Sequence, residues 1–178
     1  MRLFIAIPLP ADVTEALFAL QRRIAMDGAR LTQVKAEHMH ITLAFLGERN
    51  DAEAIGEKLR AMTITPFQLM LGSLGSFGGR TPRVIWAGIS ESAALARVHR
   101  QIGAALGIHE TMRAHITLAR VRACDETGCE LLGRAIKEVE TPRVMWTVDR
   151  ACLYSSSLTP SGPIHAELAS THILFTPQ

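Results

Sequence analysis

The sequence is poor in several features that mark specialised classes of protein. Its 178 residues include three cysteines, one tyrosine and 5% aromatic residues, and its formal net charge is only +2. No apolar run approaches the roughly 20 residues of a membrane-spanning helix, so no membrane partner is expected. So small a charge argues against tight, sequence-independent binding of long nucleic acids, but it is compatible with a small anionic ligand or a single nucleic-acid end.

The cysteines predict neither a disulfide scaffold nor a zinc ribbon. They are odd in number, and Cys124 and Cys129 have a C-x4-C spacing instead of C-x2-C. The apolar start of the chain is interrupted by Pro8 and Pro10, so we expect a buried strand there and not a secretory signal. Together these features predict a protein of the reducing cytoplasm.

The sequence does contain enough apolar material for a core, since 48% of its residues are apolar and 20% are charged. Two-residue alternation and helical periodicity divide it into strands and helices. Strands are predicted at Arg2–Pro8, Leu31–Lys35, His40–Leu46, Phe67–Leu71, Arg83–Ile89 and His115–Val121, with two more between Val144 and Phe175. Helices are predicted at Asp12–Met26, Asp51–Met62, Glu91–Leu106 and Thr127–Val139.

The order of these elements indicates an α+β fold. Several strands follow one another with no helix between them, which disfavours a purely parallel sheet. The strands at Leu31–Lys35 and His40–Leu46 are expected to pair, and the glycine-rich segment Gly72–Gly79 is expected to be a hairpin loop. No polar linker separates independent domains, so residues 1–178 are predicted to form a single domain of two lobes.

One segment of the chain occurs twice. His40-Ile41-Thr42-Leu43-Ala44 recurs identically as His115-Ile116-Thr117-Leu118-Ala119. Because successive side chains of a strand point to opposite faces, each copy places its His and Thr on one face and its Ile and Leu on the other. A polar pair on a sheet needs a groove or hydrogen-bond partners. We therefore predict that two pseudo-symmetric lobes line a shared groove with their His-Thr faces.

Two imidazoles in one groove suit a displacement at phosphorus. Unperturbed imidazole titrates near pH 6.5, so one ring can take the proton of the nucleophile while the other protonates the leaving oxygen. The hydroxyls of Thr42 and Thr117 are candidates to donate to the non-bridging phosphoryl oxygens without a metal. Arg120 is a candidate cation, although regular alternation would place it on the face opposite to His115 unless the strand bends or ends.

Other side chains have more ordinary interpretations. His38 shares the alternation of His40, but no Asp, Glu or Cys in the motif supplies a third ligand, so no metal site is expected. Some aromatic residues are suited to stacking on a base, yet apolar residues in strands are core residues far more often. These residues are Phe4, Phe45, Phe77 and Trp86.

The two motifs resemble those of a known family, the 2H phosphoesterases, and within it the RNA 2′,3′-cyclic phosphodiesterases, also called 2′-5′ RNA ligases. The resemblance covers nearly the whole chain. It includes the segments Arg2–Ile7, His40–Glu48, Gly75–Phe77, Arg83–Gly88 and His115–Arg120. The chain departs from the family at Ala114, where proline is common, at His165, where an aromatic residue is usual, and at Gln33–Lys35, which lacks a tryptophan.

The resemblance implies a bilobal fold in which two pseudo-symmetric antiparallel sheets flank a central cleft, with helices outside. It also implies hydrolysis of a 2′,3′-cyclic phosphate at an RNA end to a 2′-phosphate with no metal or other cofactor, and reversible, ATP-independent 2′-5′ joining. His40 would then be the general acid that protonates the 3′ oxygen and His115 the general base. Thr42, Thr117 and Arg120 would hold the phosphate.

Alternatives stay open within and outside this chemistry. The catalytic motif does not read the rest of the substrate, so the partner is either an RNA end or a small cyclic nucleotide such as an ADP-ribose cyclic phosphate. A nucleotide-binding module that has lost turnover is a third interpretation. The presence of both histidines and both threonines favours catalysis, and no obligate protein partner is evident.

Overall fold

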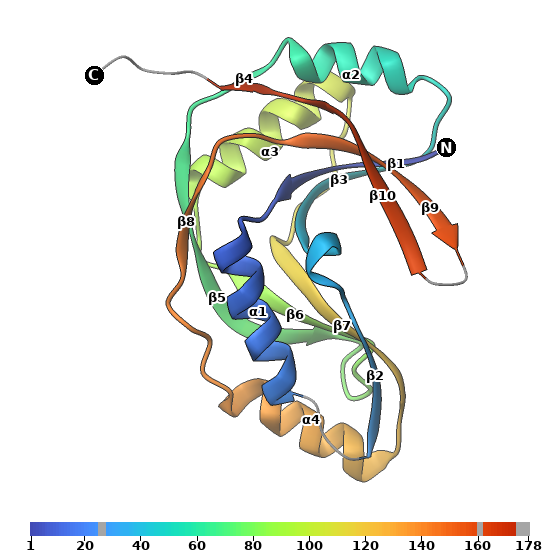
Figure 1. Ribbon diagram of the computed structural model, residues 1–178, viewed down its shortest axis with the longest axis vertical. Coiled ribbons are helices and arrows are strands. Elements are labelled where there is room, and N and C mark those ends of the chain that lie inside the picture. Colours follow the sequence, from blue (N-terminus) through green and yellow to red (C-terminus); the bar gives the residue numbers. More distant parts are fainter. Residues whose placement is uncertain (25–27, 160–161, 174–178) are drawn as a thin grey trace.

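The structure is a computed structural model that describes residues 1–24, 28–159 and 162–173 (Figure 1). Its helices are α1 (Ala11–Ile24), α2 (Ala52–Arg60), α3 (Ala93–Leu106) and α4 (Glu126–Glu138), with a short 3-10 turn, η1, at Ala36–His38. Its strands are β1 (Arg2–Pro8), β2 (Ala29–Gln33), β3 (His40–Glu48), β4 (Thr63–Ile64), β5 (Phe67–Phe77), β6 (Val84–Ile89), β7 (His115–Cys124), β8 (Met145–Val148), β9 (Cys152–Thr159), β10 (Gly162–Ser170) and β11 (His172–Ile173).

Most of the described strands form one curled sheet (Figure 1). Its order is β10-β9-β1-β3-β7-β6-β5-β8, with β2 added beside β7, and every pairing in it is antiparallel. Helices α2 and α3 pack against one half of the sheet, and α1 and α4 pack against the other. The mixed fold expected from the sequence is therefore present, while the two expected sheets are two halves of a single hydrogen-bonded path.

The helices are amphipathic and bury one face each against the sheet. In α1 the buried apolar residues are Val13, Leu17, Leu20 and Ile24, at intervals of three or four. The ends of the other helices follow their sequence: the Ser92 hydroxyl accepts the Leu95 N–H at the start of α3, and Gly107 ends that helix with φ of 70°. Helix α4 begins where the Asp125 carboxylate accepts the Gly128 N–H at 2.7 Å.

Two predictions about the strands are wrong. The segment at Ala29–Gln33 pairs with β7 and not with β3, so the expected strand pair is absent and η1 lies between the two strands. The glycine-rich segment is mostly strand, because β5 continues to Phe77 and only Gly78 and Gly79 lie in the turn, both with positive φ. Gly75 is needed inside β5 because a Cβ there would overlap the ring of Trp86.

The C-terminal part of the chain and the cysteines also differ from expectation. The two strands predicted there are present as β9 and β10, which pair with each other, and the described residues also form β8 and β11. The predicted end of this region at Phe175, like the end of the first helix at Met26, lies outside the described residues. Cys124 and Cys129 form a disulfide that joins the end of β7 to α4, while Cys152 is free and buried. This single disulfide was not predicted from the cysteine spacing.

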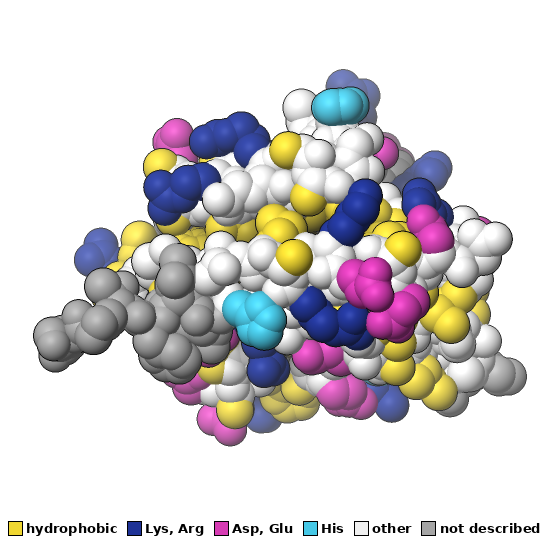
Figure 2. Space-filling view, turned by 90° about the horizontal axis from the view of Figure 1, so that it is seen from above, with side chains coloured by type: hydrophobic (Ala, Val, Ile, Leu, Met, Phe, Trp, Pro, Cys, Tyr) yellow, Lys and Arg dark blue, Asp and Glu magenta, His cyan; other side chains and the backbone are white. Residues whose placement is uncertain are grey.

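The outer surface at the α2 end carries charges of both signs. Figure 2 views the molecule from that end and shows Lys and Arg side chains interspersed with Asp and Glu. One such pair is Arg60 and Glu53, whose side chains approach to 3.1 Å on α2. Within the described ranges, no helix is long and apolar enough to cross a membrane.

Candidate active site

The repeated pentapeptide forms two strands with the same pattern of burial. Ile41 and Leu43 of β3 are 0% and 3% exposed, and Ile116 and Leu118 of β7 are both fully buried. The His and Thr of each motif are only half-buried. The alternation predicted from the sequence is therefore present in both strands, with the apolar residues in the core and the polar pair on the opposite face.

Strands β3 and β7 meet at one Cα pair, Ile41 with Ile116. An antiparallel pair has a local twofold axis, and residues paired across it point to the same face. The neighbours of this pair point to the other face. His40, Thr42, His115 and Thr117 therefore share one face of the sheet, which we call the histidine face.

The two imidazoles are held in the same way. The Nδ1 atom of His40 is 2.8 Å from the carbonyl oxygen of His38, and the Nδ1 atom of His115 is 2.7 Å from that of Arg113. A carbonyl only accepts hydrogen bonds, so Nδ1 carries the hydrogen in both rings. The Nε2 atom of each neutral ring is then unprotonated, and it is the atom available to exchange a proton.

The surroundings of His40 are mostly rings. Its centroid is 4.9 Å from that of Phe4 and 5.7 Å from that of His165. The pKa of His40 is lowered to about 4, mainly by burial and further by the charges of His165, His115 and His38, whereas the hydrogen bond to the His38 carbonyl opposes the shift. His40 is therefore a neutral imidazole in the ligand-free protein at neutral pH.

The surroundings of His115 combine rings with a cation. Its centroid is 5.0 Å from that of Phe77 and 6.2 Å from that of Trp86. The guanidinium carbon of Arg113 lies over both of these rings, 5.4 Å from the first and 5.0 Å from the second. The Trp86 ring occupies the space that a side chain at Gly75 would fill, so that glycine fixes where this aromatic pair lies.

A β-bulge brings Arg120 to the histidine face. Thr117 pairs with Trp86 and Ala119 with Ile85, so Leu118 has no partner in β6. An extra residue in one strand reverses the alternation after it. Arg120 consequently pairs with Val84, two residues from Trp86, and lies on the same face as Thr117. With regular alternation Arg120 would lie on the face opposite to His115. This bulge is the irregularity that places it on the same face.

The bulge is stabilised by a buried amide. The carbonyl oxygen of Leu118 accepts from the Gln21 Nε2 at 2.7 Å and from the Val34 N–H at 2.8 Å. Gln21 is 2% exposed and lies on α1. Because Gln21 of α1 donates to the carbonyl of the bulged residue, helix α1 helps to fix the position of Arg120.

The first motif bulges at the equivalent residue but presents a different side chain. Thr42 pairs with Ala6 and Ala44 with Ile5, which leaves Leu43 unpaired. Phe45 then pairs with Phe4 on the histidine face and is 68% exposed. The two halves of the face thus carry phenylalanine and arginine at equivalent positions.

The match of the chain to a known protein family agrees with this geometry. Residues 7–159 match the family model described as the 2′-5′ RNA ligase superfamily. The chain belongs to this superfamily. The resemblance inferred from the two motifs is thereby confirmed.

Members of the superfamily with similar sequences carry a common name. An RNA 2′,3′-cyclic phosphodiesterase of Thermotoga maritima is 32% identical over 94% of this chain and 93% of its own length. The enzyme of that name from Methanocaldococcus jannaschii is 33% identical over 93% and 96%. Both alignments span nearly all of each protein.

Solved structures show the same fold in the superfamily. A protein of Thermus thermophilus superposes with a TM-score of 0.73 at 30% identity and covers 96% of both chains. Escherichia coli LigT complexed with phosphate superposes with a TM-score of 0.71 at 26% identity and covers 95% of both chains. The curled antiparallel sheet is therefore shared with these proteins.

This superfamily member has further site residues that sequence reasoning did not select. His165 of β10 contacts the rings of Phe4, His38 and His40, and burial followed by the charge of His38 lowers its pKa. Tyr154 of β9 stacks on Phe4 at 5.3 Å. In the sequence His165 stood out only as a departure from the family, because the pairing of β9 with β1 was not visible there.

Within the described ranges, no group of three or more His, Cys, Asp or Glu side chains gathers in a way that could hold a metal ion. The two motifs and Arg120 supply the histidine face with two imidazoles, two hydroxyls and a guanidinium.

Proposed function

We propose that this superfamily member hydrolyses the 2′,3′-cyclic phosphate at an RNA end to a 2′-phosphate, by proton transfers at His40 and His115. The observation that carries the proposal is the local twofold arrangement of two imidazoles on one face, each fixed through Nδ1 and free at Nε2. The names of the relatives support the substrate class, since proteins about one-third identical over nearly their whole length are RNA 2′,3′-cyclic phosphodiesterases.

The proposed reaction is a direct displacement at phosphorus. The Nε2 of His115 takes a proton from water, and the water oxygen forms a bond to phosphorus. The bond from phosphorus to the 3′ oxygen breaks, and the Nε2 of His40 delivers a proton to that oxygen. The hydroxyls of Thr42 and Thr117 and the guanidinium of Arg120 donate to the non-bridging oxygens, where charge increases in the transition state.

The acid role of His40 sets a condition on substrate binding. Burial keeps its pKa at about 4 in the free protein, so His40 has no proton to donate at neutral pH. A phosphate anion beside the ring favours the charged imidazole and raises this pKa. His40 therefore takes up a proton as the cyclic phosphate binds, and His115 acts as the base.

The same proposal extends to RNA joining. If the 5′-hydroxyl of a second RNA replaces water, its oxygen bonds to phosphorus as the 3′ oxygen leaves, and a 2′-5′ phosphodiester forms. The reverse reaction uses the same two proton transfers with exchanged direction. No bond in this sequence requires ATP.

Two alternative functions would use the same site. One is a 2H phosphodiesterase of small cyclic nucleotides; structures of the Escherichia coli relative complexed with 3′-AMP and with NADP+ show that such a protein accepts small nucleotides. The other is binding without turnover, which the presence of both imidazoles with free Nε2 atoms disfavours.

The experiment is an assay of EDTA-treated protein with adenosine 2′,3′-cyclic phosphate, with the product identified by phosphorus NMR. We expect adenosine 2′-phosphate as the product, formed by the wild type and not by His40→Ala or His115→Ala. A 3′-phosphate product, or full activity in both variants, would overturn the mechanism. Loss of activity with EDTA and its recovery with added metal would show that a metal is required.

A further inference from the structure

The two residues that orient the catalytic imidazoles have different side chains. His38 and Arg113 occupy equivalent positions, each two residues before a catalytic histidine, and each supplies the carbonyl that accepts its Nδ1 hydrogen. Because that contact uses the backbone, the side chain is free to differ. His38 packs against the ring of His165, whereas Arg113 is exposed and lies over Trp86 and Phe77. The cation of Arg113 is thus not needed to hold His115.

The guanidinium of Arg113 is fixed in place but has no polar partner. Two rings hold its carbon at 5.0 and 5.4 Å, and both rings also contact His115. No hydrogen bond or ion pair of this side chain occurs among the described residues. Contact with a ring uses the face of the guanidinium plane, so its N–H donors remain free. They form a planar fork that matches the oxygens of a phosphate.

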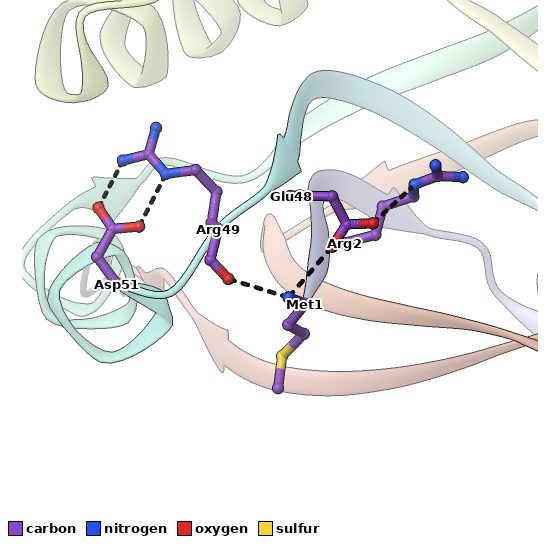
Figure 3. Close-up of polar contacts among 5 residues, drawn as sticks. All are labelled: Met1, Arg2, Glu48, Arg49 and Asp51. Atoms are coloured by element: carbon purple, nitrogen blue, oxygen red, sulfur yellow. Dashed lines mark hydrogen bonds and ion pairs between the residues drawn. The ribbon is translucent and has the colours of Figure 1, made fainter.

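The ion pairs among the described residues are distributed unevenly along the chain. All the ion pairs among the described residues lie within residues 1–60, including Arg2 with Glu48 and Arg49 with Asp51 (Figure 3). Among the residues that the structure describes, the arginines near the second motif form none. These are Arg80, Arg83, Arg113, Arg120 and Arg122. A group of cations without acidic partners attracts a polyanion to that half.

Building on the proposed function, we infer that Arg113 binds the phosphodiester next to the nucleotide that carries the cyclic phosphate. Arg120 and the two threonines bind the reacting phosphate. Arg113 is separated from His115 by an aromatic ring, at a position that the preceding phosphate of an RNA chain can reach. A mononucleotide has no such phosphate. Arg113 therefore selects RNA ends over cyclic mononucleotides and acts as a specificity-determining residue.

The test compares two substrates that differ by one adenosine and its phosphodiester: adenosine 2′,3′-cyclic phosphate and the dinucleotide adenylyl-(3′→5′)-adenosine 2′,3′-cyclic phosphate. Arg113→Gln keeps the backbone carbonyl that orients His115. It should lower kcat/KM on the dinucleotide about 10- to 100-fold more than on the mononucleotide, which corresponds to one charged hydrogen-bonding contact. Arg113→Lys should recover only part of the loss, because it keeps the charge without the fork.

Two controls make the result specific. Arg100→Gln removes the same charge from the exposed face of α3 and should leave both rates at wild-type values. A dinucleotide with an uncharged methylphosphonate linkage should lose its advantage with the wild type, and Arg113→Gln should then add no further loss. Added salt should weaken binding of the natural dinucleotide to the wild type more steeply than to Arg113→Gln.

The outcomes separate this inference from the proposed function. If Arg113→Gln leaves the ratio of kcat/KM on the dinucleotide to that on the mononucleotide unchanged, the role of Arg113 is overturned while the enzyme remains active. If the wild type hydrolyses neither substrate, the proposed function fails. The affinity for the dinucleotide then decides the inference: it must fall in Arg113→Gln and not in Arg100→Gln.

Discussion

The two halves of the histidine face share a backbone and differ in what surrounds it. His40 and His115 donate through Nδ1 to equivalent carbonyls, and both strands bulge at the leucine that follows. Around His40 lie Phe4 and further imidazoles, whereas Arg113 lies over a ring that contacts His115, and Arg120 follows along the same strand. The duplicated pentapeptide therefore fixes the geometry of the reacting groups, and their neighbours give the two halves different tasks.

The largest expected effect comes from removing either imidazole. His40→Ala and His115→Ala should each lower kcat by about 10³-fold, because each ring transfers one proton in the transition state. The double variant should be little worse than either single variant, since the two rings act as a unit. Steady-state rates on a 2′,3′-cyclic phosphate measure this, with His99→Ala on α3 as the control. If either single variant kept a tenth of the activity, the two halves would not be partners.

Removing the positive charge of Arg120 at the bulge should lower the activity less than removing an imidazole. Arg120→Gln should lower kcat/KM about 10- to 100-fold, because a charged hydrogen bond to the phosphate is lost. The equivalent change in the other half, Phe45→Gln, removes no charge and should cost less than a tenth as much. The ratio of the two losses is the readout. Equal losses would show that the bulges do not separate phosphate binding from the aromatic half.

The burial of His40 predicts how stability depends on pH. Its pKa is about 4 in the folded protein and near 6.5 in the unfolded chain, so the unfolded chain binds more protons between these values. Stability is therefore complete above pH 6.5 and is lost as the pH falls toward 4. From pH 7 to pH 5 the loss should be about 2 kcal/mol. Urea unfolding at pH 7 and pH 5 measures this loss of unfolding free energy. The loss should be smaller by that amount in His40→Gln than in the wild type, and equal losses in the two proteins would contradict the low pKa of His40.

The smallest expected effect is the uptake of one proton. The catalytically inactive His115→Ala variant retains His40, and it should take up close to one proton when adenosine 2′,3′-cyclic phosphate binds at pH 7. Calorimetry in buffers of different ionisation enthalpy measures this uptake directly. Absence of uptake would mean that His40 stays neutral and serves as the base, which would exchange the roles of the two halves.

The sequence predicted those parts of the site that depend on local pattern. Alternation was sufficient to place His40, Thr42, His115 and Thr117 on polar strand faces, since their apolar neighbours must enter the core. It failed at Arg120, because a bulge depends on the partner strand and on a donor from α1, neither of which appears in the local pattern.

Long-range pairing accounts for the other differences. Strand β2 pairs with β7, far along the chain, and the approach of His165 to His40 requires β10, β9, β1 and β3 to be assembled first. Glycine content was also misleading: Gly75 lies inside β5 because of the Trp86 ring, which belongs to another strand. A spacing of C-x4-C gave no sign that the turn from β7 into α4 would bring Cys124 and Cys129 together.

The most direct test of this mechanism is a crystal structure of the protein with adenosine 2′-phosphate bound. We expect one phosphate on the histidine face, with its oxygens about 2.6–3.2 Å from the Nε2 atoms of both His40 and His115. A phosphate that contacts only one imidazole, or that binds away from both, would contradict the claim that the two halves act on the same phosphorus.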